Sequence, residues 1–492
     1  MGAMGILAKT FQKRFAAAGA KTANKSPAPP LPKGVFDNAG GQEAAFFTMG
    51  FAKTDVMPGD IDKKKYYIAG YRPFNPAQGV LDPMTASAVW LDDNSGRGGV
   101  VFVSVDNVGM VSKDVLAAKA LLADFVKKTG CRSLNILSTH NHAGIDTMGM
   151  WGALPRTGRN PKYMRVVFEG IKNVVEQAYA GRREGSLYLG RNDAPDIQRD
   201  SRLPEVFSKT LTRLRFVPND GGREVWMLNF ASHSESLLGA NSLVSADFPC
   251  YLRQEILREK KAETIYFVGA IGGLIRMKEL DKDNVESTKI AGRKLAETAF
   301  AIENEVKLAP RINILKQEFY AEAQNFALLA AAKFGILNAK KQAIKTAGYT
   351  GYALKTEMTY FEIDSLKMLL LPGEIFPELV YGGYLSAEES AEGKGPEVNP
   401  LPLCEIAEDE NLLVFGLAND EIGYIVTPND FLLDPETSYF DGGKDRLGRR
   451  HYEETNSLGP NTAYTIAETF TEMMQTVKAS AARDTTIGEE TK

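Results

Sequence analysis

The chain has 492 residues, of which 44% are hydrophobic and 24% are charged, and its formal net charge is -4. A chain of this length and composition can bury a sizeable core, and its near-neutral balance of charge argues against nucleic acid as a partner. Three cysteines are too few for a disulfide framework or a cysteine-based zinc site, and no apolar run approaches the roughly 20 residues that span a bilayer.

Residues 1–45 are interpreted as a basic, proline-rich extension ahead of the folded unit. Apolar residues recur at roughly helical spacing between residues 6 and 18. The first acidic residue of the chain, Asp37, comes after a series of basic residues that includes Lys9, Lys13, Arg14, Lys21 and Lys25. Because lysines interrupt the apolar centre that a secretory signal needs, we expect a cytoplasmic location. Two interpretations remain, a helix in weak contact with an anionic membrane surface and a poorly ordered tail.

Residues 26–33 form a proline-rich spacer that we expect to be extended, and residues 480–492 form a polar tail without periodicity. Between these ends strands and helices alternate. The predicted strands are residues 87–91, 99–104, 133–138, 225–231, 264–268 and 366–371. The predicted helices are residues 111–128, 162–180, 249–260, 287–306, 323–339 and 462–477. This order predicts a single α/β domain over residues 46–479, with mixed β-sheets flanked by helices.

The chain contains only four histidines, and each lies in a compact polar or glycine-flanked cluster. His140 and His142 follow the predicted strand 133–138, and His233 follows the strand 225–231. Glu374 follows the strand 366–371 within a Pro-Gly-Glu segment. Because α/β sheets commonly build sites at the carboxyl ends of their strands, we expect these side chains to meet in one centre.

A catalytic zinc ion commonly takes three histidine or carboxylate ligands and leaves one position for water. His140, His233 and Glu374 would supply such a set. The two histidines of His140-Asn-His142 lie two residues apart, so in an extended segment they share one face. The alternatives are a pair of solvated loop histidines, a hydrogen-bonded structural His233 and an ordinary turn at Glu374.

An ordered set of short segments carries a further signal. The segments are residues 50–55, 69–71, 79–83, 138–144, 243–247, 371–374, 416–424 and 451–460. In this order they resemble segments of the neutral ceramidases, the zinc amidases that cleave the N-acyl bond of ceramide. Ser138-Thr-His-Asn-His-Ala-Gly144, for example, is similar to the family's Thr-His-Thr-His-Ser-Gly. The resemblance covers roughly residues 46–477.

The resemblance implies a ceramidase-like catalytic domain and assigns roles to individual residues. It places the Zn²⁺ ligands at His140, His233, Glu374 and Tyr424. Tyr424 rests on the resemblance alone, and its alternative is a core aromatic in a strand. The resemblance also implies that His142 handles protons beside the metal and that Tyr452 donates to the oxyanion that forms on the substrate carbonyl. His451 then matters only as the neighbour of Tyr452.

One departure from the family pattern concerns the nucleophile. Ceramidases carry an active-site serine in a Gly-Asp-x-Ser-Pro segment, and the matching Gly272-Gly-Leu-Ile-Arg276 places Ile275 at that position. An isoleucine can neither attack nor hydrogen-bond. We therefore expect a water activated by the metal to be the nucleophile. The sequence after residue 477 is also too short for the immunoglobulin-like domain that usually follows, so we expect the catalytic domain alone.

Two further residues are candidates for contact with a substrate. Asp146 could contact a polar substrate or orient a histidine, or it could cap a turn. Arg202 resembles family arginines near the site and suits a carboxylate or phosphate, and its alternative is a surface salt bridge.

Together these patterns predict a zinc-dependent hydrolase that cleaves the N-acyl amide bond of a small or lipid-like substrate. An esterase or lactonase with the same metal site and a non-catalytic metal- or lipid-binding protein are the alternatives. The sequence leaves the oligomeric state open.

Overall fold

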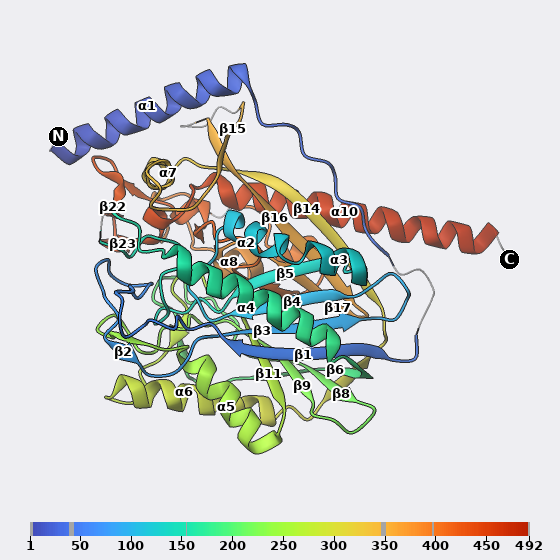
Figure 1. Cartoon of the computed structure of the whole chain (residues 1–492). Helices are drawn as coiled ribbons and strands as arrows, with labels where there is room; N and C mark the ends of the chain where they lie inside the picture. The colour runs from blue at the N-terminus through green and yellow to red at the C-terminus, as the bar shows by residue number, and fades with distance from the viewer. Residues whose placement is uncertain (1–2, 39–43, 154, 346–350, 396–397, 491–492) are drawn as a thin grey trace.

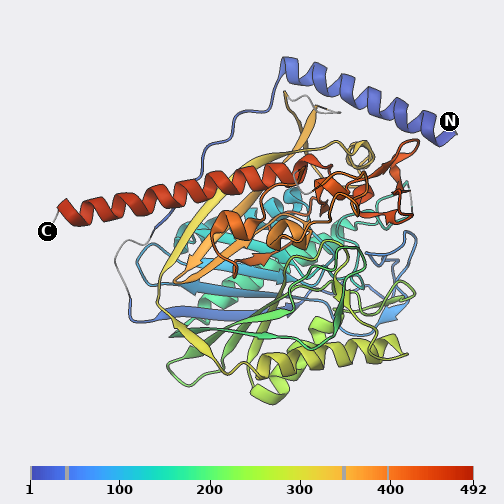
Figure 2. The same ribbon diagram turned by 180° about the vertical axis from the view of Figure 1, so that it is seen from behind.

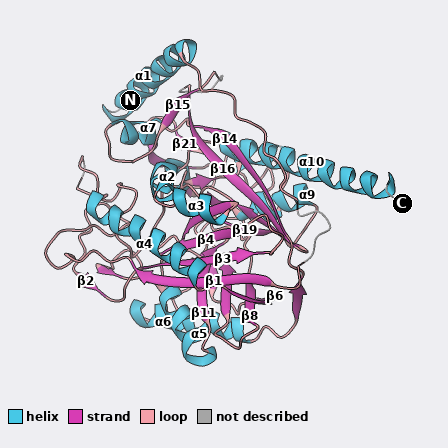
Figure 3. Cartoon of the chain, turned by 45° about the vertical axis from the view of Figure 1, so that its right-hand side comes forward, coloured by secondary structure: helices cyan, strands magenta, loops and turns pink. Residues whose placement is uncertain are grey.

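The computed structural model describes residues 3–38, 44–153, 155–345, 351–395 and 398–490. Two β-sheets occupy the centre of the molecule, and helices lie on its outside (Figure 1, Figure 3). Buried apolar side chains fill the space between the two sheets, and further apolar clusters lie beneath the helices on either side. The predicted α/β class with mixed sheets flanked by helices is therefore confirmed.

The larger sheet has nine strands in the spatial order β11-β9-β8-β6-β1-β3-β4-β5, with β13 paired to β6. The pairs β4–β5 and β9–β11 are parallel, and the other pairs are antiparallel. The strands are β1 (Phe47–Asp55), β3 (Thr85–Asp92), β4 (Val100–Val105), β5 (Ser133–Ser138), β6 (Arg183–Asp193), β8 (Thr210–Pro218), β9 (Val225–Phe230), β11 (Glu263–Val268) and β13 (Glu305–Leu308).

The larger sheet is bent so strongly that its two ends approach each other. The Oγ of Ser104 in β4 donates a hydrogen bond of 2.6 Å to the carbonyl of Tyr266 in β11, although five strands lie between β4 and β11 in the sheet order. Asn141 and Ser234, which follow β5 and β9, also form a parallel bridge. This bend brings the carboxyl ends of β5 and β9 together.

The second sheet has five strands in the order β14-β16-β17-β19, with β15 paired to β16. They are β14 (Ile312–Glu322), β15 (Lys341–Ala343), β16 (Tyr352–Ile363), β17 (Leu366–Leu370) and β19 (Leu413–Phe415). Alternation along β9 explains how the layers pack, because successive side chains of a strand point to opposite faces. Val225 and Met227 face the second sheet, whereas Trp226 and Leu228 pack beneath helices.

Helices cover both outer faces. On the larger sheet they are α2 (Ser112–Ala120), α3 (Ala123–Thr129), α4 (Pro161–Ala180), α5 (Phe248–Lys260) and α6 (Asn284–Phe300). On the second sheet they are α1 (Ala3–Lys25), α7 (Phe326–Lys333), α8 (Pro377–Tyr381), α9 (Leu403–Ala407) and α10 (Asn461–Glu490). Figure 2 shows α10 running across the back of the molecule. Within the described ranges, no helix is long and apolar enough to cross a membrane.

Short elements complete the fold near the site. The paired strands are β2 (Gly79–Val80) with β10 (Leu243–Val244), β7 (Gln198–Arg199) with β12 (Arg276–Met277), and β18 (Glu374–Ile375) with β20 (Tyr424–Ile425). A three-stranded sheet contains β21 (Leu433–Asp434), β22 (Ser438–Lys444) and β23 (Arg450–His451). The 3₁₀ helices are η2 (Pro428–Asp430) and η3 (Glu453–Asn456).

The six predicted strands are present, but three predicted helices differ in extent. The helix predicted at 111–128 is two helices. The backbone N–H groups of Leu121 and Leu122 donate to carbonyls three residues earlier, and this tighter turn separates α2 from α3. The helix predicted at 287–306 ends at Phe300, and β13 follows. The helix predicted at 323–339 starts later, because the Asn325 side chain accepts hydrogen bonds from the backbone at Ala327 and Leu328 and caps it. Conversely, α10 continues as a helix through most of the predicted polar tail.

The amino-terminal extension is packed onto the second sheet. Phe15 of α1 is buried, and its ring centroid lies 6.5 Å from that of Tyr352. The proline-rich spacer is held in an extended form, since Tyr320 donates a hydrogen bond of 2.8 Å to the carbonyl of Pro29. The segment is therefore a packed helix, and the expectation of a poorly ordered tail was wrong. Its contact with a membrane surface stays a prediction.

Candidate metal centre

His140 lies just beyond the end of β5 in a left-handed backbone conformation, with φ of 53°. Such a conformation is uncommon for a residue other than glycine and marks a position held by its surroundings. The Nδ1 of His140 lies 2.7 Å from the carbonyl oxygen of Val108. A carbonyl can only accept, so Nδ1 carries the proton and Nε2 keeps its lone pair.

His233 repeats this arrangement at the end of β9. Its backbone N–H donates to the carbonyl of Ile275 at 2.8 Å, and its Nδ1 donates to the same oxygen at 2.9 Å. The ring is completely buried and cannot turn without breaking this bond. A backbone carbonyl thus fixes the tautomer of each imidazole, as hydrogen-bond acceptors commonly do for metal-binding histidines.

Glu374 completes the centre from the second sheet, four residues past the end of β17. Its Oε2 lies 3.1 Å from the Nε2 of His140 and 3.0 Å from the Nε2 of His233. All three side chains are buried. Three lone pairs facing one another out of water repel unless a cation lies among them. The donor set therefore fits a divalent cation, and two histidines with one carboxylate are ligands that zinc accepts.

The electrostatics of the centre agree with this fit. Burial lowers the pKa of His140, but the Glu374 carboxylate outweighs it and raises that pKa to about 9. Burial raises the pKa of Glu374, and the two imidazoles bring it below its ordinary value. In the absence of a metal ion, the same three groups therefore retain a proton.

His142 adjoins the centre without sharing its hydrogen-bond pattern. Its Nε2 lies 3.0 Å from the Nε2 of His140, and its Nδ1 lies 3.3 Å from Oε2 of Glu235. Burial and the neighbouring imidazoles hold its pKa well below the ordinary value. Its ring packs edge-on against Tyr71 and lies over Gly70, where an added Cβ would come within 2.5 Å of the ring.

Of the two tyrosines implied by the resemblance, Tyr424 is buried and Tyr452 is exposed. Tyr424 in β20 pairs with Glu374 in β18 and is buried. Burial and the Glu374 carboxylate raise its pKa well above the ordinary value. Tyr452 is 49% exposed, and burial of its hydroxyl together with Glu374 raises its pKa to about 12. Both therefore line the site as neutral phenols in the metal-free protein.

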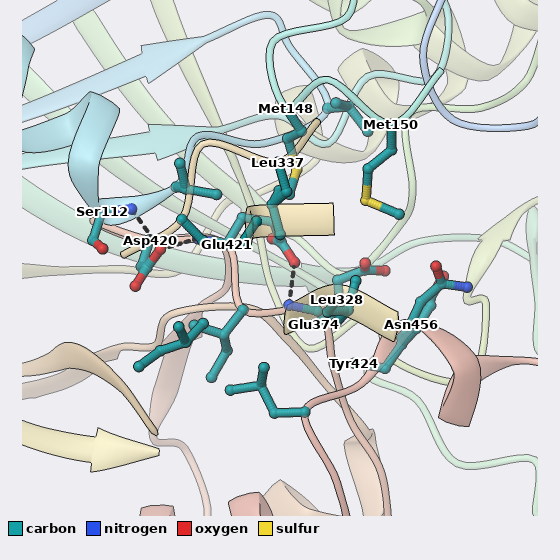
Figure 4. Close-up of a pocket in the computed structure, with 18 of the residues that line it drawn as sticks. Ser112, Met148, Met150, Leu328, Leu337, Glu374, Asp420, Glu421, Tyr424 and Asn456 are labelled. Atoms are coloured by element: carbon teal, nitrogen blue, oxygen red, sulfur yellow. Dashed lines mark hydrogen bonds between the residues drawn. The ribbon is translucent and has the colours of Figure 1, made fainter. Parts of the chain in front are cut away.

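The centre lies in a pocket whose remaining walls are mostly apolar. Figure 4 shows Met148, Met150 and Leu337 gathered along one side of it, with Glu374 and Tyr424 on the other. Further apolar lining comes from Val108, Val111, Trp151, Leu328, Leu329, Ala332 and Leu354. A pocket with an apolar wall and a few convergent polar groups is typical of a small-molecule site.

The fold that carries this centre has solved counterparts. The neutral ceramidase from Pseudomonas aeruginosa superposes with a TM-score of 0.65 at 17% identity, over 88% of this chain and 74% of that one. A ceramidase complexed with C2 gives 0.66 at 15% identity, over 88% and 76%. The chain has the neutral ceramidase fold. At this level the resemblance stated from the sequence is confirmed. No protein-family model and no curated protein matches the sequence.

Within the ceramidase fold, Ile275 occupies a structural position. Its side chain is fully buried, and its carbonyl oxygen accepts both hydrogen bonds from His233. Gly272, three residues earlier, allows its segment to pack closely against the segment that contains Phe376, since a Cβ at Gly272 would come within 2.5 Å of the backbone nitrogen of Phe376. The segment that resembles the serine loop therefore supports His233 through its backbone.

The structure places Asp146 within a turn and away from the pocket lining. It is fully buried, and its carboxylate accepts hydrogen bonds from the backbone at Met148, Gly149 and Trp151 at 3.0, 2.6 and 2.9 Å. Of the roles considered for Asp146, this is the turn cap. Its consequence for the site is indirect, because the turn carries the apolar wall of Met148 and Trp151.

Arg202 forms ion pairs with other residues of the protein, and these pairs are buried. Its buried guanidinium lies 2.9 Å from Asp430, 2.9 Å from Glu453 and 2.8 Å from Glu454. His451 joins this buried cluster, with its Nδ1 2.7 Å from Glu454. Neither Arg202 nor His451 lines the pocket, so the cluster supports the loop between β23 and η3 that carries Tyr452.

Glu421 is a site residue that the sequence did not indicate. It lines the pocket, and its Oε1 accepts a hydrogen bond of 2.8 Å from Gly423. Its Oε2 is buried without a partner among the described residues, and burial together with Glu374 raises the pKa of Glu421 to about 8. An acidic residue is ordinarily exposed, so no sequence signal distinguished it.

Proposed function

We propose that the chain is a metal-dependent hydrolase of the ceramidase kind that cleaves the N-acyl amide bond of a lipid-like substrate. The observation that carries this proposal is the convergence of two carbonyl-locked imidazoles on Glu374 in an apolar pocket. The ceramidase fold supports it. His140, His233 and Glu374 would hold the ion, which we expect to be zinc, and Tyr424 would complete the set. A zinc ion so held lowers the pKa of a bound water toward 7 and polarises a carbonyl group.

The apolar wall of the pocket determines how a substrate binds. An acyl chain placed along Met148, Met150 and Leu337 would lose its contact with water and bring its carbonyl carbon toward the histidines. Excluding water there also strengthens every polar interaction in the site. The wall therefore favours a hydrophobic acyl group over a charged one.

His142 and Tyr452 supply the proton and the hydrogen bond that amide cleavage requires. His142 is held between Glu235 and the centre, so it can take a proton from the attacking water and deliver it to the departing amine while Glu235 stabilises the imidazolium. Tyr452 keeps its phenolic proton at neutral pH and can donate it to the carbonyl oxygen as negative charge develops. A preorganised donor of this kind contributes about 3 kcal/mol to the transition state.

The nucleophile follows from the position of Ile275. Its side chain is buried and offers no hydroxyl, so a covalent serine intermediate at this position is not available. A water molecule therefore attacks directly, and the acyl carbon–nitrogen bond breaks without an acyl-enzyme. An ester or lactone would follow the same course with an easier leaving group.

Metal content and activity test the proposal together. We expect about one zinc ion per purified chain by elemental analysis. The two groups of described residues that could hold an ion share His140, and they are His140, His142 and His233, and His140, Glu374 and Glu421. His140→Ala and His233→Ala should each abolish both metal binding and hydrolysis of a long-chain N-acyl amide. His451→Gln is the matched control, since it removes a histidine outside the centre and should retain the metal. Undiminished metal content in His140→Ala would overturn the assignment.

Matched amide and ester substrates address the bond that is cleaved. We expect the amide to be hydrolysed with kcat/KM at least comparable to that of the ester with the same acyl chain. Much faster turnover of the ester at equal binding would favour an esterase instead. If the metal binds normally and neither substrate reacts, the protein is the non-catalytic alternative.

A further inference from the structure

We propose that α1, together with the end of α7, forms a docking surface for an anionic membrane next to a helix that lines the pocket. The delivery of a lipid from that membrane to the pocket rests on the proposed function, whereas the docking itself does not. The surface is built from four features of the described chain.

The first feature is the division of α1 into two faces. Small and aromatic residues spaced three, four or seven positions apart, which share one helix face, are buried against the body of the protein, and they are Gly5, Ala8, Phe15, Gly19 and Ala23. The opposite face is exposed and basic, with Lys13, Arg14, Lys21 and Lys25. The helix contains no acidic residue, and these four side chains form no ion pair with the described part of the chain.

The second feature is a set of exposed apolar side chains near this basic face. Ile6 is 58% exposed and Leu7 is 48% exposed at the start of α1, and Phe334, directly after α7, is 65% exposed. Basic side chains beside a few apolar ones complement an anionic bilayer, whose headgroups attract the charge and whose acyl boundary accepts the apolar groups. The whole chain has a net charge of -4, so this basic surface is local.

The third feature is that α1 is held in place. The backbone of Ala28 donates a hydrogen bond of 2.8 Å to Ala343 in β15, and the side chain of Gln317 accepts one of 2.7 Å from Gly34. The spacer after α1 therefore lies along the second sheet and fixes the end of the helix. A fixed basic helix orients the protein on a membrane, which a free tail would not do.

The fourth feature connects this surface with the pocket. Lys333 at the end of α7 lies 5.9 Å from the ring of Phe15, so α1 and α7 are neighbours. The same helix lines the pocket through Leu328, Leu329 and Ala332. Helix α7 therefore connects α1 with the wall of the pocket. A lipid leaving the bilayer there would reach an apolar wall.

Sedimentation with vesicles tests the docking surface. We expect the protein to sediment at low salt with mixed vesicles of phosphatidylcholine and phosphatidylserine and to be released from them at high salt. It should not sediment with vesicles of pure phosphatidylcholine. The triple variant K13E/R14E/K21E should bind the anionic vesicles at least about tenfold more weakly, because each basic residue near the surface contributes severalfold to the affinity.

The matched control is K260E/K282E/K307E, which changes the net charge equally but alters exposed lysines on the side of the larger sheet. It should bind like the wild type. The proposal is overturned if the wild type does not bind anionic vesicles at low salt, or if K13E/R14E/K21E binds them as the wild type does. Circular dichroism of each variant confirms that the fold is retained.

A second measurement tests the connection with the pocket. K13E/R14E/K21E should hydrolyse a vesicle-borne N-acyl lipid at least about tenfold more slowly, in proportion to its lost affinity, and a soluble short-chain amide at the wild-type rate. Equal loss on both substrates, or on neither, would refute the placement beside the pocket. If the wild type binds vesicles but hydrolyses neither substrate, the proposed function fails and the docking surface stands.

Discussion

The buried cluster around Arg202 offers a sharp test, because the sequence left two roles open for this residue. Arg202→Leu would remove a cation that pairs with Asp430, Glu453 and Glu454 at once. Burial raises the pKa of Glu454, but the guanidinium outweighs it and lowers that pKa to about 2. In the variant the buried carboxylates would lose this partner and repel one another.

The magnitude follows from the burial of all four groups. Breaking a buried ion pair by removing one partner costs about 3–5 kcal/mol, and here three carboxylates share the arginine. We therefore expect the free energy of unfolding to fall by at least about 3 kcal/mol. The loop that carries Tyr452 should loosen as well, so kcat should fall more than KM rises.

Urea unfolding followed by tryptophan fluorescence measures this loss. Arg258→Leu is the control, because Arg258 is a surface residue whose side chain is 64% exposed and pairs with Glu255. Its removal should change the unfolding free energy by less than about 1 kcal/mol. The reasoning is refuted if Arg202→Leu unfolds at the wild-type urea concentration and instead weakens the binding of an acidic substrate.

Three further predictions concern single positions. Gly70→Ala would place a Cβ 2.5 Å from the His142 ring at a φ of 108°. We therefore expect this variant to lose about 2–4 kcal/mol of stability and to have a lower kcat. Gly59→Ala is the control and should change neither, because a Cβ at Gly59 meets no atom within 4 Å. Burial raises the pKa of Glu378 to about 8, so the wild type should lose a few kcal/mol of stability as the pH rises from about 4.5 through 8. The unfolding midpoints measured at pH 5 and at pH 9 should therefore differ less in Glu378→Gln than in the wild type. Ile275→Ser should lose about 2–4 kcal/mol through its buried cavity and hydroxyl and gain no serine reactivity, so labelling by a fluorophosphonate would contradict it.

Periodicity and turn chemistry predicted much of the fold. The strands that end before His140, His233 and Glu374 could be found because their side chains are buried on both faces and form short apolar runs. Glycine, proline and polar residues mark their ends. The expectation that strand ends deliver the site residues therefore agrees with the structure.

What the sequence could not provide depends on long-range geometry. The bend that joins β4 to β11 arises from the summed twist of many strands, and no local pattern records it. The burial of Arg202 likewise depends on residues distant in the sequence. The same holds for the buried Oε2 of Glu421, which has no hydrogen-bond partner among the described residues. For α1, composition indicated a basic helix, but only the packing of Phe15 decides that it is docked.

The centre takes its groups from both sheets. His140 follows β5 and His233 follows β9 in the larger sheet, whereas Glu374 follows β17 in the second. An ion shared by these three ligands would bridge the two sheets as a noncovalent cross-link, and it would bind only the assembled sandwich. By mass action such an ion adds about 2.7 kcal/mol at a free concentration a hundred times its Kd. The lifetime of the folded protein in a cell would then follow the supply of the metal, so scarcity would remove the protein as well as its activity.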